Sequence, residues 1–127
     1  MKIEHIQTDK APAAVGPYSQ GTMAGNLVFV SGSLGIDPET GKLKDDFTEQ
    51  VRQALQNISA ILGSAGLGMK DVVKTTVFLK DLSLFGKFNE IYRNYFGETK
   101  PARSTVEVSR LPLDAMVEIE AIAVSEA

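Results

Sequence analysis

Arg103 is the side chain whose type and position best suit the binding of a small anion. It follows Pro101, which ends the preceding segment, and it opens a stretch in which Val106 and Val108 alternate with polar residues, as in a strand. Alternation places Thr105 on the same face as Arg103. A guanidinium there can hold a carboxylate or phosphate with two hydrogen bonds. The local pattern alone favours a surface arginine with its head group in water, so other features must decide.

Glu118 and Glu120 are the carboxylates whose setting suggests chemistry. Both share one face of a predicted C-terminal strand with Met116, Ile122 and Val124. A carboxylate among apolar neighbours lies at an edge, pairs with an arginine, or acts as a general acid or base with a raised pKa. Which of the two faces Arg103 depends on strand register, and the sequence leaves that open.

Three further polar residues stand where functional groups are often displayed or where burial is expected. Tyr18 and Ser31 lie at strand ends beside proline or glycine. Asn89 falls within the apolar stripe of a predicted helix, near Phe85 and Phe96 on a helical wheel. A buried asparagine needs hydrogen-bond partners and can offer them to a ligand, whereas at the edge of the stripe it would bond to backbone.

Composition narrows the classes of function. The 127 residues include no cysteine and one histidine, His5, which excludes thiolate chemistry and disfavours a serine triad or a metal site. The net charge of −3 and the scattered basic residues disfavour broad capture of nucleic acid. No apolar run reaches the roughly 18 residues of a membrane span, and no apolar leader opens the chain. We expect a cytoplasmic protein without metal, cofactor or membrane contact.

The elements that must position these residues follow the order β-β-β-α-β-α-β-β, an α+β fold in a single domain over residues 1–127. Strands are predicted over residues 3–7, 19–24, 27–31, 72–79, 103–108 and 117–124, with Val73, Thr75, Val77 and Leu79 sharing a face. The first helix begins at the N-cap Asp46 and stops at Gly66, and Ser83 caps the second, which ends at Gly97.

The sheet has more apolar surface than two helices can cover. The final strand is apolar on both sides, and the run from Leu27 to Val30 is apolar without alternation, as expected of a strand covered on both faces. Two helices pack on one face only. We therefore expect self-association through the open sheet faces.

Six separated motifs, in order, resemble the Rid family of reactive-intermediate deaminases, also called the YjgF family. The resemblance runs from about Ala11 to Val124 and is strongest to the RidA subfamily of 2-iminobutanoate/2-iminopropanoate deaminases. The motifs are Gly16-Pro17-Tyr18-Ser19-Gln20, Val30-Ser31-Gly32, Lys74-Thr75-Thr76-Val77-Phe78-Leu79, Asn89-Glu90-Ile91-Tyr92, Pro101-Ala102-Arg103-Ser104, and Arg110-Leu111-Pro112 through Glu118-Ile119-Glu120-Ala121.

The resemblance implies a chorismate-mutase-like fold and a homotrimer whose sheets form a central barrel, with sites in clefts between subunits. It implies that Arg103 binds a substrate carboxylate and that Glu118 positions or activates water. Tyr18 would assist catalysis, and the pocket would be completed by Ser31, Gly32, Asn89 and Thr105. Thr105 and Ser33 depart from the cysteine and glutamine of many relatives, so thiol chemistry is not required and the substrate range is open.

The activity implied by the resemblance is hydrolysis of 2-aminoacrylate, 2-aminocrotonate and their imine tautomers to 2-oxo acids and ammonia. Pyridoxal-phosphate dehydratases release these compounds, so a functional coupling to such enzymes is implied. Two alternatives stay open. One is a non-catalytic trimer that binds small carboxylates or regulates a partner. The other is an endoribonuclease or translation inhibitor, which the acidic chain and single histidine disfavour.

Overall fold

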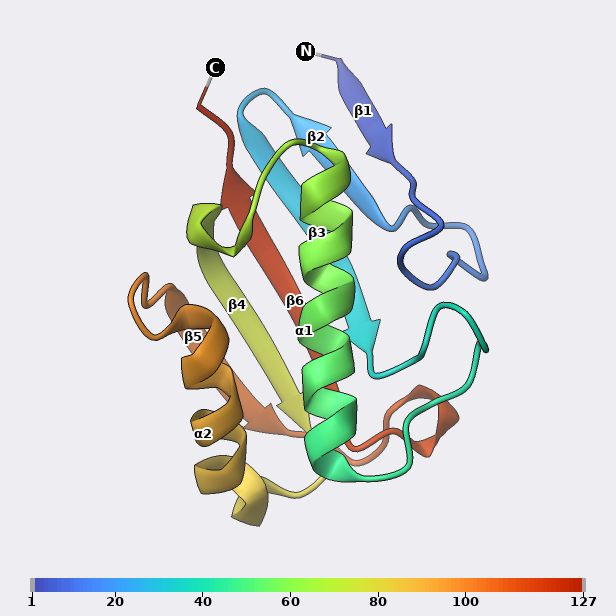
Figure 1. Cartoon of the computed structure of the whole chain (residues 1–127), viewed down its shortest axis with the longest axis vertical. Coiled ribbons are helices and arrows are strands. Elements are labelled where there is room, and N and C mark those ends of the chain that lie inside the picture. The colour runs from blue at the N-terminus through green and yellow to red at the C-terminus, as the bar shows by residue number, and fades with distance from the viewer. Residues whose placement is uncertain (1, 127) are drawn as a thin grey trace.

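Two helices lie on one face of a six-stranded mixed sheet in the computed structural model, which describes residues 2–126 (Figure 1). The strand order is β1-β2-β3-β6-β4-β5, and every neighbouring pair is antiparallel except β4 and β5. The predicted mixed α+β fold is therefore confirmed. The strands are β1 (Ile3–Ile6), β2 (Gly21–Ala24), β3 (Leu27–Leu34), β4 (Val72–Leu79), β5 (Ala102–Glu107) and β6 (Val117–Val124), and the helices are α1 (Phe47–Ser64) and α2 (Phe85–Phe96).

Local signals in the sequence set the ends of α1. The Asp46 carboxylate accepts a hydrogen bond from the Glu49 amide at 2.8 Å, so Asp46 is the N-cap. Gly66 follows the helix with a φ of 79°, a conformation that favours glycine. The second helix begins differently from the prediction. Ser83 is not a cap, because the Asp81 carboxylate accepts from the Ser83 amide and starts a short 3₁₀ turn that leads into α2.

Two β-bulges alter the predicted strands. β3 continues past Ser31 to Leu34, and its register with β6 shifts between Val30 and Ser33. A second shift between Val72 and Lys74 turns Val73 outward. The prediction that Val73 shares a face with the buried Thr75 is therefore wrong. A bulge adds one residue to a strand, so the side chains before it point to the opposite face from the one that simple alternation predicts.

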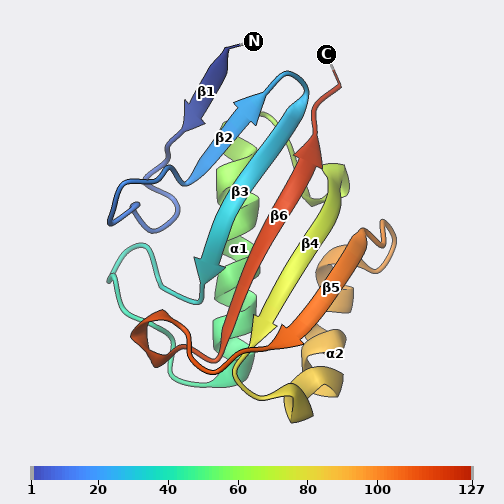
Figure 2. The same ribbon diagram turned by 180° about the vertical axis from the view of Figure 1, so that it is seen from behind.

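The two faces of the sheet differ in what covers them. Val28, Val77 and Ile119 are fully buried beneath the helices. The opposite face carries no helix (Figure 2), and Leu27 and Phe29 are 38% and 39% exposed there. The run from Leu27 to Val30 is thus covered on one face only within the single chain. The uncovered face expected from the sequence is present.

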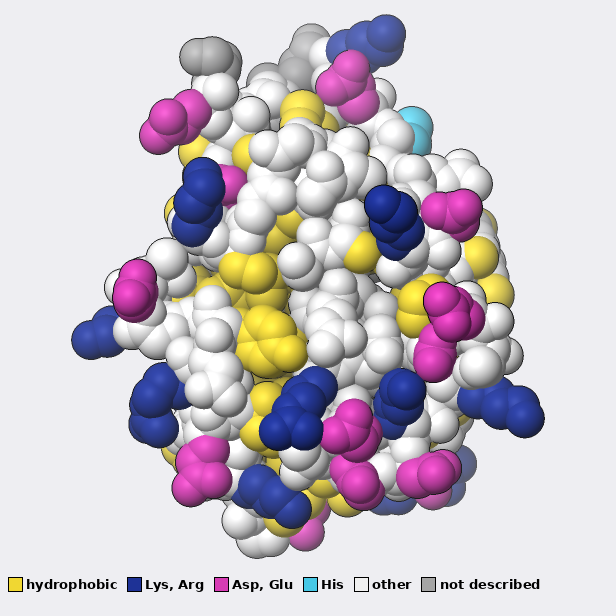
Figure 3. All heavy atoms as spheres, in the orientation of Figure 1, with side chains coloured by type: hydrophobic (Ala, Val, Ile, Leu, Met, Phe, Trp, Pro, Cys, Tyr) yellow, Lys and Arg dark blue, Asp and Glu magenta, His cyan; other side chains and the backbone are white. Residues whose placement is uncertain are grey.

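The side of the molecule that carries the helices is charged and mixed in sign. Figure 3 shows basic and acidic side chains scattered over it, with hydrophobic side chains visible in a band between α1 and α2. No helix within residues 2–126 is both long enough and apolar enough to cross a bilayer.

Candidate functional site

An open cavity of about 660 Å³ lies at the end of β3, where the N-terminal loop and the loop after β3 meet β6. Four of the predicted site residues line it together: Tyr18, Ser31, Gly32 and Glu118. They come from segments that are far apart in the chain, and strand pairing between β3 and β6 brings them to one place.

The Glu118 carboxylate lies directly over Gly32. A Cβ atom added at Gly32 would come within 2.8 Å of the Glu118 Cδ atom and 3.1 Å of both carboxylate oxygens. Carbon atoms do not approach so closely without displacement, so the Glu118 carboxylate can keep this place only while position 32 has no side chain. The bulge in β3 turns Gly32 toward β6 and creates this contact.

Burial raises the pKa of the Glu118 carboxyl above its ordinary value of 4.5, and the charge of Glu120 on the same face raises it further. Glu120 is the more exposed of the two, and it is not among the residues that line the cavity. The sequence did not decide which of the two carboxylates lies at the site. The strand register in the structure places Glu118, and not Glu120, in this cavity. A half-buried carboxyl with a raised pKa is a better proton acceptor than an ordinary carboxylate, and is suited to accept and return a proton.

Tyr18 and Ser31 are held differently at the cavity wall. The Ser31 hydroxyl donates to the Ser19 carbonyl at 2.6 Å, so its proton is already engaged and it can offer a ligand only an acceptor. Tyr18 is 53% exposed, and its hydroxyl accepts a long hydrogen bond of 3.4 Å from the Val15 amide. The Tyr18 hydroxyl proton is therefore available to a bound molecule.

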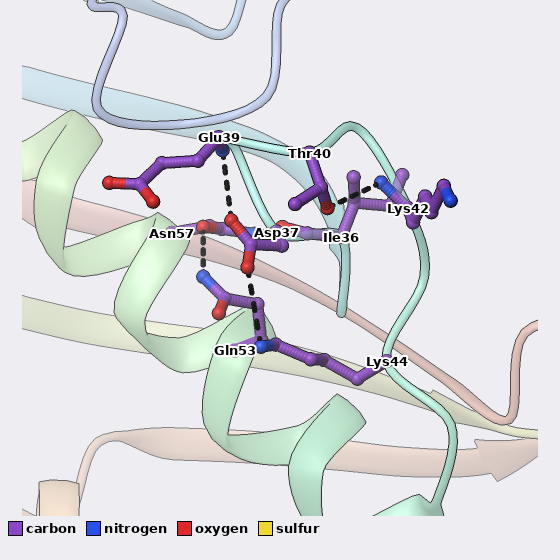
Figure 4. Close-up of polar contacts among 8 residues, drawn as sticks. All are labelled: Ile36, Asp37, Glu39, Thr40, Lys42, Lys44, Gln53 and Asn57. Carbon is purple, nitrogen blue, oxygen red and sulfur yellow. Dashed lines mark hydrogen bonds and ion pairs between the residues drawn. The ribbon is translucent and has the colours of Figure 1, made fainter.

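Buried amide side chains hold the loops that form the cavity, and we did not predict them. The Asn57 amide donates to the Leu34 and Ile36 carbonyls at 3.2 and 2.9 Å. Its oxygen accepts from the Gln53 amide at 2.8 Å (Figure 4). Gln20 similarly binds the backbone of the N-terminal loop through both amide atoms.

A signal for one of these amides is present in the sequence. Asn57 lies at helical spacing from the buried residues Ala54 and Ile61, on the core side of α1. A polar residue at a core position needs partners, and loop carbonyls are the usual ones.

The loop after β3 is further fixed by an ion pair. Lys44 contacts the Asp37 carboxylate at 3.3 Å, and the same carboxylate accepts from the Glu39 amide at 2.9 Å (Figure 4). The Glu39 amide is the main cause that lowers the pKa of Asp37, with a smaller contribution from Lys44. This loop contributes Pro38 to the cavity wall.

Arg103 lies on the opposite face of the sheet from Glu118. Arg103 pairs across strands with Thr75, which in turn pairs with Ala121, and that row faces the helices. Glu118 pairs with Phe78 in the row that faces away from them. Directly opposed residues project from the same side of a sheet. The two predicted active-site residues of one chain therefore cannot meet.

Asn89 and Thr105 also lie outside the cavity. Thr105 is on the helix side of β5 with Arg103, and its buried hydroxyl has no hydrogen-bond partner within the described part of the chain. Asn89, on α2, is half-buried, whereas Phe88 and Phe96 are fully or almost fully buried. Asn89 thus lies at the edge of the apolar stripe rather than inside it. The predicted site residues form two separate groups in one chain.

The described residues provide no cluster that could hold a metal ion. Within residues 2–126, no three His, Cys, Asp or Glu side chains gather closely enough for one. His5 is exposed, and its Nδ1 atom lies 2.8 Å from the Ser19 hydroxyl.

Comparisons with known proteins agree with this fold. The profile of the family described as Endoribonuclease L-PSP matches residues 8–125. The RutC family protein of Pyrococcus abyssi is 56% identical over 127 residues, which cover 99% of this chain and 100% of the relative. The 2-iminobutanoate/2-iminopropanoate deaminase of Salmonella typhimurium is 52% identical over 122 residues, which cover 94% of this chain and 95% of the relative.

A solved structure supports the same relationship. The YjgF gene product of Escherichia coli has a TM-score of 0.93 and 50% sequence identity to this chain, over 97% of this chain and 99% of that one. The resemblance inferred from the six motifs is therefore confirmed. The chain belongs to the Endoribonuclease L-PSP family, which is the YjgF or Rid family.

Proposed function

We propose that the protein hydrolyses 2-imino acids and their enamine tautomers to 2-oxo acids and ammonia. The observation that carries this proposal is the Glu118 carboxyl, which lies over Gly32 in an open cavity and has a raised pKa. The name of the Salmonella relative, at 52% identity, supports the same class of reaction. The substrates are 2-iminopropanoate and 2-iminobutanoate, with 2-aminoacrylate and 2-aminocrotonate as their enamine forms.

The reaction needs a water, a base and a proton for the leaving group. As the Glu118 carboxylate takes a proton from water, the water oxygen bonds to the imine carbon and the C=N electron pair moves to nitrogen. The Glu118 carboxyl then returns that proton to nitrogen, which gives a carbinolamine. In a second transfer the Glu118 carboxylate takes the hydroxyl proton and passes it to the amine nitrogen, so that the carbonyl forms, the C–N bond breaks and ammonia leaves. The Tyr18 hydroxyl proton is free to bind an oxygen of the substrate. These steps use no metal and no cofactor.

The substrate carboxylate is bound by Arg103, with Asn89 and Thr105 beside it. Since Arg103 and Glu118 face opposite sides of one sheet, a complete site uses Arg103 of one copy and Glu118 of another. Ser31 and Gly32 contact the substrate from the copy that supplies Glu118. A closed homotrimer repeats this arrangement three times and also covers the exposed sheet face. The unpaired Thr105 hydroxyl supports a partner or ligand at that position.

A coupled assay tests the proposal. Threonine and threonine dehydratase, a pyridoxal-phosphate enzyme, supply 2-aminocrotonate, and the formation of 2-oxobutanoate is followed with and without the protein. We expect acceleration by the wild type. Arg103→Ala should lose roughly tenfold to a thousandfold of it, as for a charged contact worth about 2–5 kcal/mol. An absence of acceleration by the wild type contradicts the proposal.

Two other functions give different outcomes in the same experiments. A module that only binds small carboxylates needs Arg103 but not the proton transfer, so Glu118→Gln would bind 2-oxobutanoate like the wild type and the wild type would accelerate nothing. The family description favours testing RNA cleavage as well. Cleavage that survives in both Arg103→Ala and Glu118→Gln would indicate a contaminating nuclease rather than this site.

A further inference from the structure

Three aromatic rings of α2 surround the Arg103 guanidinium. Its Cζ atom lies 4.8 Å from the ring centroid of Tyr92, 5.4 Å from that of Phe85 and 5.7 Å from that of Phe88. A guanidinium within about 6 Å of a ring centroid is attracted by the negative face of the ring. Arg103 therefore meets three such attractions at once, all from one helix.

Strand register places Tyr92 over Arg103. Thr75 on β4 lies directly opposite Arg103 on β5, and the Thr75 hydroxyl lies 2.7 Å from the Tyr92 hydroxyl in a buried hydrogen bond. Tyr92 also packs between Phe88 and Phe96, at ring-centroid distances of 5.3 and 4.7 Å. The ring that lies nearest to Arg103 is thus held on several sides.

Arg103 has no acidic partner in the described part of the chain. None of the ion pairs within residues 2–126 involves Arg103, so no carboxylate oxygen lies within 4.0 Å of its guanidinium. An aromatic ring holds a cation without neutralising it, whereas a carboxylate partner would compete with an anionic substrate. A half-buried guanidinium that has no carboxylate partner keeps its charge for a ligand.

We propose that Tyr92 and Phe85 are positioning residues that orient Arg103 toward the carboxylate of the substrate. This inference rests on the proposed function, in which Arg103 binds that carboxylate. Tyr92 is 8% exposed and contacts the Arg103 guanidinium from the core side, whereas Phe85 is 39% exposed and contacts it from the solvent side. Phe88 is fully buried and belongs to the core. The Thr75 hydrogen bond keeps the Tyr92 ring at its place over the strand.

Two measurements on the intact protein test this inference. The first is the dissociation constant of 2-oxobutanoate, measured by calorimetry. The second is the Nε–Hε resonance of Arg103, assigned by its loss in Arg103→Lys, because ring currents shift it whether or not a ligand binds. The variants are Phe85→Leu, Tyr92→Leu and Tyr92→Phe. Tyr95→Leu is the control, because Tyr95 lies on the same helix and is not among the rings that the Arg103 guanidinium contacts within residues 2–126.

We expect Phe85→Leu and Tyr92→Leu to weaken 2-oxobutanoate binding by roughly 3- to 30-fold, the range of cation–π contacts, and to move the Arg103 resonance. Tyr92→Phe keeps the ring and should bind within about twofold of the wild type. Since Phe85 is exposed, Phe85→Leu will fold even if Tyr92→Leu does not. Binding by Phe85→Leu equal to that of Tyr95→Leu, with an unmoved resonance, would overturn the inference.

Failure of the proposed function gives a different pattern. If the wild type neither binds 2-oxobutanoate nor accelerates its formation, Arg103 is not a carboxylate anchor. The resonance then still reports whether the rings hold Arg103. If Arg103→Ala abolishes binding while Phe85→Leu and Tyr92→Leu leave both the affinity and the resonance unchanged, the proposed function stands and the positioning role is wrong.

Discussion

Arg103 and Glu118 of one chain project from opposite faces of the same sheet. β4 lies between the two strands that carry them, and its Thr75 and Phe78 side chains mark the two faces. No rotation of either side chain carries it through the sheet. If both residues act on one substrate, they come from different copies of the chain.

Mixed assemblies test this relationship directly. Arg103→Ala and Glu118→Gln chains, each expected to have low activity alone, are unfolded together and refolded at equal concentration. Because each site draws one residue from each of two copies, random assembly should restore about one quarter of the wild-type sites. The measurement is 2-oxobutanoate formation in the coupled assay. The control is a mixture of the two folded proteins that were never unfolded together. If co-refolding gives no more activity than this control, the sites are not shared between copies.

Gly32→Ala should damage the site through a single methyl group. The added Cβ would come within 2.8 Å of the Glu118 Cδ atom, so the carboxylate must move out of its position. The displaced atoms are the free end of a flexible side chain, so we expect a small loss of thermal stability and a much larger loss of turnover.

Gly63→Ala is the matched control for this substitution. Nothing lies within 4 Å of a Cβ built at Gly63, which is in α1. The substitution there should leave turnover unchanged and raise stability by up to about 1 kcal/mol, since alanine is the better helix former. A Gly32→Ala protein with the turnover of the wild type would show that the place of the Glu118 carboxylate is not critical.

The rate of hydrolysis should fall as the pH falls through a window that begins above the ordinary carboxyl range. Burial and then the charge of Glu120 raise the pKa of Glu118 above 4.5, and the base must be unprotonated to take a proton from water. Rates are measured with dehydratase in excess and corrected for the reaction without the protein. A rate that is unchanged down to about pH 4.5 would remove Glu118 as the base.

The same carboxyl makes stability depend on pH in a defined direction. Because the pKa of Glu118 is raised on folding, its contribution is present in full below the unfolded value near 4.5 and is lost as the pH rises through the folded value. Glu118→Gln cannot ionise, so we expect it to match the wild type at low pH and to exceed its free energy of unfolding at neutral pH.

Urea unfolding at both pH values and equal protein concentration measures this difference. Glu90→Gln is the control, because Glu90 is exposed on α2. A Glu118→Gln protein that loses stability relative to wild type as the pH rises would show that the Glu118 carboxylate is stabilised, not penalised, in the assembled protein.

Asn57→Ala should loosen the loop after β3. The substitution removes both donors to the Leu34 and Ile36 carbonyls, and each buried group left without a partner costs about 1–3 kcal/mol. We expect a lower free energy of unfolding in urea and a higher KM. Gln53→Ala removes only the donor to the Asn57 side-chain oxygen, so it should change the free energy of unfolding and the KM much less. Equal effects of the two substitutions would mean that the loop does not depend on Asn57.

Much of the fold was predictable because its signals are local. Asp46 and Gly66 bound α1 through contacts within one turn, and alternation correctly assigned Arg103 and Thr105 to one face of β5. Alternation also placed Glu118 and Glu120 on one face of β6. Such features depend on backbone geometry over a few residues, which the sequence specifies directly.

Long-range pairing decided the rest. The bulge that turns Gly32 toward Glu118 comes from the register between β3 and β6, strands that lie far apart in sequence. The amide of Asn57 is meaningful only once the loop after β3 packs on α1.

The sequence by itself determined which residue types are available for chemistry, and which of them share a face within each strand. Only the tertiary structure decided that β4 separates β5 from β6 and that Arg103 faces α2 while Glu118 faces the uncovered side. The physical reason is that a strand has two equivalent faces. The partner strands and the covering helices, not the local period, decide which face meets the core.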